Sequence, residues 1–211
     1  MTDRYPIPHL PPQALHRTEQ IIKRSRFITS TAHAPSSEAA RAFVERIRQE
    51  FPDATHNCWA FAAGAPGHTA RVGFSDDGEP HGTAGRPMLT VLLHGGVGEI
   101  VSVVTRYFGG IKLGTGGLVR AYQGAVQENM GTLPTRERII PSHLDVILEY
   151  AFIERFRRLL PAHEAVVTAE EFGTDAVFSV SLPQEHASAF ALALAELTDG
   201  GALVEPRDAE T

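Results

Sequence analysis

Apolar residues recur along the chain either at every second position or at every third to fourth, and these spacings predict strands and helices respectively. Between Ala40 and Phe51 the spacing is helical, and Pro52 ends this helix because proline lacks the N–H that a helix interior needs. Residues 100–108 form the most apolar run of the first half and predict the central strand of a sheet. The other elements predicted for this half are strands over 19–32, 55–63 and 71–74 and helices over 88–93 and about 118–130.

The second half has a regular order of strands and helices. Alternating apolar residues predict its strands, and an alanine-rich amphipathic run near the C-terminus predicts its longest helix. The predicted elements are a strand over 143–150, a helix over 153–160, strands over 164–171 and 176–182, a helix over 184–197 and a short strand over 202–205. This β-α-β-β-α-β order is typical of the ferredoxin-like fold.

The patterns therefore predict an α+β protein of two domains. Residues 1–18 are rich in proline and polar groups, which favours a flexible tail. Residues 19–136 form the first predicted domain and residues 137–211 the second. The segment 131–138 joins them and contains Pro134, so we expect a protease to cut there and to leave two folded pieces.

Cysteine content and hydropathy limit the classes of protein to which the chain can belong. Cys58 is the one cysteine among 211 residues, so no internal disulfide can form and we expect a reducing cytoplasm. No apolar run approaches the roughly 18 residues of a membrane helix, and the first residues lack the apolar core of a secretory signal.

The charge is divided unevenly between the two predicted domains. Residues 1–136 hold 14 Lys and Arg against 11 Asp and Glu, whereas residues 137–211 hold 5 against 14. A net charge of +3 beside one of −9 would draw polyanions to the first domain and repel them from the second. Ordinary surface variation explains so small a positive excess equally well.

The strongest local signal is GGIKLGTGG at residues 109–117, between the predicted central strand and a helix. The free N–H groups and the dipole of a helix N-terminus attract anions, so we predict a phosphate cradle with no catalytic residue and no metal. The candidate residues are Gly109, Gly110, Gly114, Gly116 and Gly117 with the cations Arg86, Arg106, Lys112 and Arg120. The segment is neither a Walker P-loop nor a dinucleotide fingerprint. A tight strand-to-helix turn with glycines at positive φ is the alternative.

An acidic segment precedes this loop and holds Asp76, Asp77, Glu79 and His81. Such a cluster could bind a divalent metal, but Asp77-Gly78 is also ordinary turn chemistry, which we favour. Because both segments precede helices, we expect them to lie close together, with Asp76 or Asp77 paired to Lys112 or Arg86.

The predicted strand 55–63 places two sets of side chains on opposite faces. His56 and Cys58 share one face and could form a nucleophile–base dyad, but a buried structural Cys58 is the better interpretation. Trp59 and Phe61 share the other face. They could stack on nucleic-acid bases, but core packing is commoner for such residues.

Three stretches together are more specific than these general signals. They are HNCWAF at 56–61, FSDDGEPHGTAGRPML at 74–89 and VVTRYFGGIKLGTGGLVRAYQGAV at 103–126. In sequence, order and spacing they resemble the YigZ/IMPACT family, and residues 137–211 resemble the C-terminal domain of its bacterial members. The resemblance implies a ribosomal protein S5 domain 2-like first domain and a ferredoxin-like second domain, a pair similar to domains IV and V of elongation factor G. It offers no established catalytic residue.

Three functions are consistent with these observations. The first is a non-enzymatic factor associated with RNA or the ribosome and acting in translation, without a cofactor and without membrane contact. The second is an enzyme or binding protein for a phosphorylated small molecule or nucleotide. The third is a protein-binding regulatory module, since the eukaryotic relatives implied by the resemblance control translation by competing for a protein partner.

Overall fold

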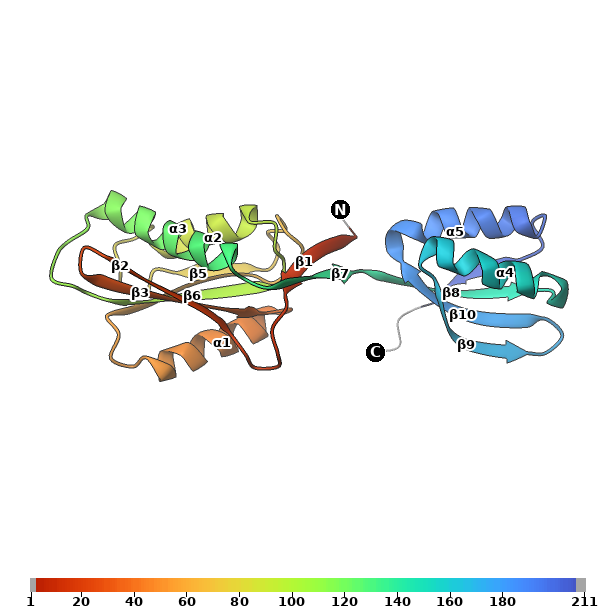
Figure 1. Ribbon diagram of the computed structural model, residues 1–211, viewed down its shortest axis with the longest axis horizontal. Coiled ribbons are helices and arrows are strands. Elements are labelled where there is room, and N and C mark those ends of the chain that lie inside the picture. Colours follow the sequence, from red (N-terminus) through yellow and green to blue (C-terminus); the bar gives the residue numbers. More distant parts are fainter. Residues whose placement is uncertain (1–2, 208–211) are drawn as a thin grey trace. The chain divides into compact units, whose positions relative to one another are not determined.

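The apolar run at the end of the first half forms strand β6 (Ile100–Tyr107), which lies at the centre of a sheet. The structure is a computed structural model that describes residues 3–207 (Figure 1). Within these residues the sheet has the order β2–β3–β6–β4–β5, and each neighbouring pair is antiparallel. The other strands are β2 (His16–Ile22), β3 (Ser25–His33), β4 (His56–Ala62) and β5 (Val72–Ser75). The predicted central strand and the predicted hairpin of β4 with β5 are confirmed.

Helices cover both faces of this sheet, with α1 (Ser37–Glu50) on one face and α2 (Gly85–His94) and α3 (Thr115–Gly131) on the other (Figure 1). Helix α1 begins after Ser36, whose Oγ accepts a hydrogen bond from the Ala39 N–H at 3.2 Å. Its predicted apolar stripe is buried against the sheet. The faces of β4 also follow the prediction, because Cys58 packs under α2 and α3 whereas Phe61 packs under α1.

The second unit is a four-stranded antiparallel sheet of order β11–β8–β10–β9. Its elements are β8 (Pro141–Leu148), a 3₁₀ turn (Tyr150–Phe152), α4 (Ile153–Leu159), a second 3₁₀ turn (Leu160–His163), β9 (Val166–Phe172), β10 (Ala176–Pro183), α5 (Gln184–Leu197) and β11 (Leu203–Pro206). The two inner strands are the first and third of the unit, as in the ferredoxin-like fold. The predicted fold of this domain and the α+β class of the whole chain are therefore confirmed.

The predicted flexible tail over residues 1–18 is wrong for its described part. Arg4–Pro8 form strand β1, in which Tyr5 and Ile7 are buried, and β2 already begins at His16. Strand β1 pairs with β7 (Thr135–Ile139) in a two-stranded ribbon. Each strand of such a ribbon has one edge without a neighbouring strand, and prolines are tolerated there. The prolines around Tyr5 and Ile7 concealed their strand spacing.

The predicted junction is likewise not a loose linker over its whole length, because β7 occupies all of residues 135–138 and is paired with β1. The two units divide between Arg138 and Ile139, two residues beyond the predicted boundary. Among the described residues, no helix has the length and apolar character needed to cross a membrane.

Residues 19–32 were expected to form one strand, but they belong to the hairpin of β2 and β3. Lys23 and Arg24 form its turn, and both have positive φ, at 46° and 67°. Neither residue is a usual turn former, so the sequence hid this reversal.

Candidate functional site

The glycine-rich loop connects the end of β6 to α3. At three of its positions the backbone conformation or a close contact favours glycine. A Cβ at Gly109 would lie 2.0 Å from the carbonyl carbon of Arg24, so only glycine allows the β2–β3 hairpin to approach the loop. Gly110 and Gly114 have φ of 83° and 75°. The tight-turn interpretation therefore accounts for these three positions. A Cβ on Gly116 would lie 3.7 Å from Arg120 Nη1, an ordinary contact, and one on Gly117 would lie 3.1 Å from the Leu113 Cβ.

Helix α3 begins at Thr115, three residues before its predicted start, with Gly114 as a cap that offers no side chain. The N–H groups of the first turn consequently remain open to an incoming anion. Arg120 lies in the second turn, not the first as expected. Its side chain nevertheless extends back toward the helix start, since Nη1 lies 3.7 Å from the position of a Cβ on Gly116.

Four cations lie on the segments that meet near this helix start, and we call them the basic rim. They are Lys23 and Arg24 in the β2–β3 turn, Lys112 in the loop and Arg120 in α3. All four are exposed. Within residues 3–207 none of them has an ion-pair partner. Lys23 and Arg120 line one cavity of about 220 Å³ together with Gly117. Sequence reasoning missed Lys23 and Arg24 because it placed them inside a strand, although a basic pair between two alternating stretches was a usable signal.

Arg106 does not belong to the basic rim. It is 5% exposed on β6, where Nη1 donates to Glu79 Oε1 at 2.5 Å and Nη2 donates to Ser25 Oγ at 3.3 Å. The expectation that Arg106 offers a free guanidinium to a phosphate is therefore wrong. Its side chain enters the side of the sheet covered by α2 and α3, and a buried carboxylate already neutralises its charge.

Glu79 joins the acidic turn to the loop, as expected for two neighbouring segments. Besides Arg106, its Oε1 accepts a hydrogen bond from the Tyr122 hydroxyl at 2.8 Å. The Cys58 thiol lies 3.4 Å from the same hydroxyl and donates to the Asp76 carbonyl at 2.9 Å. Burial raises the pKa of Cys58 and of Tyr122, so both stay protonated at neutral pH. Cys58 is buried and structural, as predicted.

The other two acids of the turn have separate structural roles. Asp76 accepts hydrogen bonds from the N–H groups of Gly82, Ala84 and Gly85 at 2.8–3.0 Å, and so caps α2. Partial burial acts to raise the pKa of Asp76, but these three bonds outweigh it and hold the pKa below its ordinary value.

Asp77 pairs with Arg48 at 2.8 Å and accepts a hydrogen bond from the Asn57 N–H at 2.7 Å. The expected pairing of Asp76 or Asp77 with Lys112 or Arg86 is therefore wrong, whereas the turn interpretation is confirmed. No group of three possible metal ligands is found in the part of the chain that the structure describes.

A cavity of about 360 Å³ lies between the acidic turn and the glycine-rich loop. Its walls are mostly apolar, Glu79 and Arg106 form its charged floor, and Lys112 and the start of α3 stand at its rim. The lining residues are Glu79, Pro80, Arg106, Phe108, Lys112, Leu113, Gly114, Thr115 and Leu118. Neither Pro80 nor Phe108 was singled out from the sequence.

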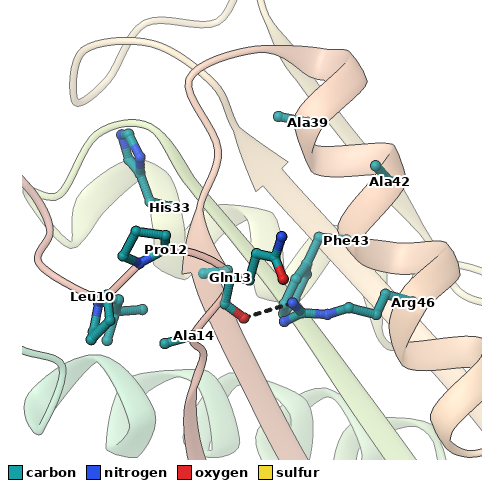
Figure 2. A pocket seen from close by; sticks show the side chains of 11 residues that line it. Leu10, Pro12, Gln13, Ala14, His33, Ala39, Ala42, Phe43 and Arg46 are labelled. Atoms are coloured by element: carbon teal, nitrogen blue, oxygen red, sulfur yellow. Dashed lines mark hydrogen bonds between the residues drawn. The ribbon is translucent and has the colours of Figure 1, made fainter.

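A third cavity, of about 390 Å³, lies between residues 10–14 and α1 (Figure 2). Figure 2 shows its one arginine, Arg46, reaching from α1 to the Gln13 carbonyl, to which Nη1 donates at 2.7 Å. Because this cation is engaged in holding the loop to the helix, the cavity lacks the free positive charge of the basic rim.

The remaining candidate residues lie outside the glycine-rich loop. Arg86 is exposed near the start of α2 and lines none of the three cavities described above. His56 bonds the Asp77 carbonyl at 2.8 Å and not the Cys58 thiol. Trp59 stacks on the buried Phe61 at 5.8 Å, as core packing predicts.

Comparison with known proteins gives matches over both units. Residues 23–130 match the Impact N-terminal domain, and residues 146–200 match a domain of unknown function, DUF1949. The chain is 45% identical to the IMPACT family member YigZ of Escherichia coli (strain K12), over 85% of this chain and 88% of the relative. It is 38% identical to an IMPACT family member of Haemophilus influenzae, over 93% of this chain and 96% of the relative. A crystal structure described as that of a hypothetical protein is 40% identical, with a TM-score of 0.66 and full coverage of both chains.

Proposed function

The chain belongs to the IMPACT family, and we propose that it acts in the regulation of translation as a non-enzymatic factor associated with RNA or the ribosome. The basic rim and the start of α3 contact phosphate groups of the nucleic acid. The link to translation rests on the family resemblance, whereas the contact with phosphate rests on the geometry of the loop.

The observation that carries this proposal is that the four rim cations lie on segments that meet near one helix N-terminus. Some surface cations of this protein are balanced by neighbouring acids, as Arg26 is by Glu19 at 2.7 Å. The rim cations have no such partner within the described chain, so a polyanion could engage several of them without first displacing a carboxylate. The open N–H groups of α3 favour the same ligand.

The charge of the second domain restricts where a polyanion can bind. With 14 acidic residues against 5 basic ones, residues 137–211 repel phosphate. The proposal therefore assigns nucleic-acid contact to the first domain alone.

The test is sedimentation of the purified protein with ribosomes and separated subunits at low and moderate salt. We expect co-migration that weakens as salt rises, because phosphate contacts release counterions. A protein that stays in the supernatant at low salt, with ribosomes present in excess, would contradict the proposal and leave the protein-binding function as the better candidate.

The open cavity beside Lys112 favours a second candidate function, an enzyme or binding protein for a phosphorylated small molecule. Its volume of about 360 Å³ lies at the lower end of the roughly 300–1,000 Å³ of such sites. A rise in melting temperature with a nucleotide, without co-migration with ribosomes, would favour this candidate.

A further inference from the structure

The cavity between the acidic turn and the loop has two chemically different ends. Its walls are apolar and include the ring of Phe108, which is 48% exposed although it lies beside a charged group. An exposed aromatic ring on a cavity wall offers a stacking surface for a flat ligand.

The floor of the cavity holds a donor that lacks a partner. The Nε of Arg106 is buried and makes no hydrogen bond in the described structure, although both terminal nitrogens of this guanidinium are engaged. Buried polar groups are nearly always paired, and an acceptor that enters the cavity can reach this covered Nε once the Arg106 side chain shifts. The carboxylate of Glu79 lies beside it and would repel an anion from the floor.

The mouth of the cavity, in contrast to its floor, attracts negative charge. Lys112 is exposed there, and Thr115 begins α3 with the free N–H groups of its first turn. An anionic group is favoured at this end and disfavoured at the floor. The ligand should therefore be a flat ring with hydrogen-bond acceptors that carries a phosphate on one side.

We infer that this cavity receives one nucleotide, with its base against Phe108 and its phosphate at Lys112 and the start of α3. The inference rests on the proposed function and makes it more specific. A base that is paired inside a duplex cannot enter a cavity. The RNA that binds here is single-stranded at the contact. The same chemistry would accept a free nucleotide, which the experiment distinguishes.

The experiment measures the affinity of a short single-stranded RNA and of its duplex for the wild-type protein and for three variants. Phe108→Ala should weaken binding of the single strand about tenfold, as loss of one base–aromatic stack does, and should leave duplex binding nearly unchanged. Phe108→Tyr should restore single-strand binding, whereas a merely structural role would not require an aromatic ring. Phe74→Ala is the matched control, since Phe74 is 44% exposed on β5 and lies outside the cavity.

The possible outcomes test the base site at Phe108 and the proposed RNA-binding function separately. If Phe108→Ala binds the single strand as tightly as wild type, the base site is overturned, and the proposed function stands provided that wild type binds RNA. If no RNA binds, melting temperatures with nucleoside monophosphates decide. A rise that Phe108→Ala abolishes supports a site for free nucleotides and overturns the RNA proposal, and no rise overturns both.

Discussion

Arg106 and Glu79 form a buried ion pair between the central strand and the turn before α2. Their positions explain how a residue that the sequence presents as a surface cation becomes part of the core. The next cations along the chain, Lys112 and Arg120, remain exposed. Residue type and spacing alone could not separate these roles, because the partner of Arg106 lies 27 positions away.

The two kinds of cation should differ sharply in their effect on stability. Arg106→Ala leaves the Glu79 carboxylate buried without a counter-charge and should lower the free energy of unfolding by about 3–5 kcal/mol. Arg120→Ala removes an exposed cation and should change it by less than about 0.5 kcal/mol. Urea denaturation of both variants measures the difference. Equal stabilities would show that the buried pair does not hold the turn to the loop.

At the scale of elements, the start of α2 depends on one carboxylate. The pKa of Asp76 is depressed in the folded protein, so its contribution to stability is present at neutral pH and is lost as the pH falls below about 4. Asp76→Asn should therefore destabilise the protein by about 1–2 kcal/mol at pH 7. The difference from wild type should shrink as the pH falls through the folded-state pKa.

Denaturation curves at several pH values measure this dependence. Asp53→Asn is a suitable control, because Asp53 accepts only an exposed hydrogen bond from Tyr107. A deficit for Asp76→Asn that stays constant down to the acid limit of folding would argue against the capping role.

The glycines of the first domain should respond to alanine in opposite ways. Gly109→Ala places a Cβ within 2.0 Å of the backbone of Arg24 and must displace the β2–β3 hairpin. Gly124 lies inside α3 with open space around its Cα, so Gly124→Ala should stabilise the helix by about 1 kcal/mol. Thermal unfolding compares the two variants, and a stable Gly109→Ala protein would refute the close approach.

The elements that the sequence predicted well are those set by local pattern. The stripe of α1, the apolar run of β6 and the ferredoxin-like order all follow from spacing within a single segment. The start of α3 was predicted three residues late because Gly116 and Gly117 are poor helix formers, yet both lie in the first turn of the helix. The Lys23–Arg24 turn lacks glycine and asparagine, the residues that usually mark positive φ, so its conformation was not predicted.

At the scale of the whole molecule, the candidate site depends on segments that are far apart in the chain. The hairpin of β2 and β3 supplies Lys23 and Arg24, and the loop before α3 supplies Lys112. The family motif indicated the loop but not the hairpin, because only the fold brings Arg24 against Gly109. The sequence could therefore indicate the candidate loop but only part of what surrounds it.

RNA binding by this protein should depend on where its cations lie and not on its net charge. Two variants with the same net charge test this. One variant replaces the four rim cations, Lys23, Arg24, Lys112 and Arg120, with glutamine. The control variant replaces four exposed cations elsewhere, Arg41, Arg136, Arg155 and Arg158, and so has the same net charge.

The most direct test is the affinity of wild type and both variants for single-stranded RNA as a function of salt concentration. The rim variant should bind more weakly and lose about 0.7 in the slope of log affinity against log salt for each phosphate contact removed. The control variant should retain nearly the wild-type slope, because it keeps all four cations of the basic rim. If the rim variant, correctly folded, shows the same affinity and slope as the control, the basic rim does not bind RNA and the central claim is wrong.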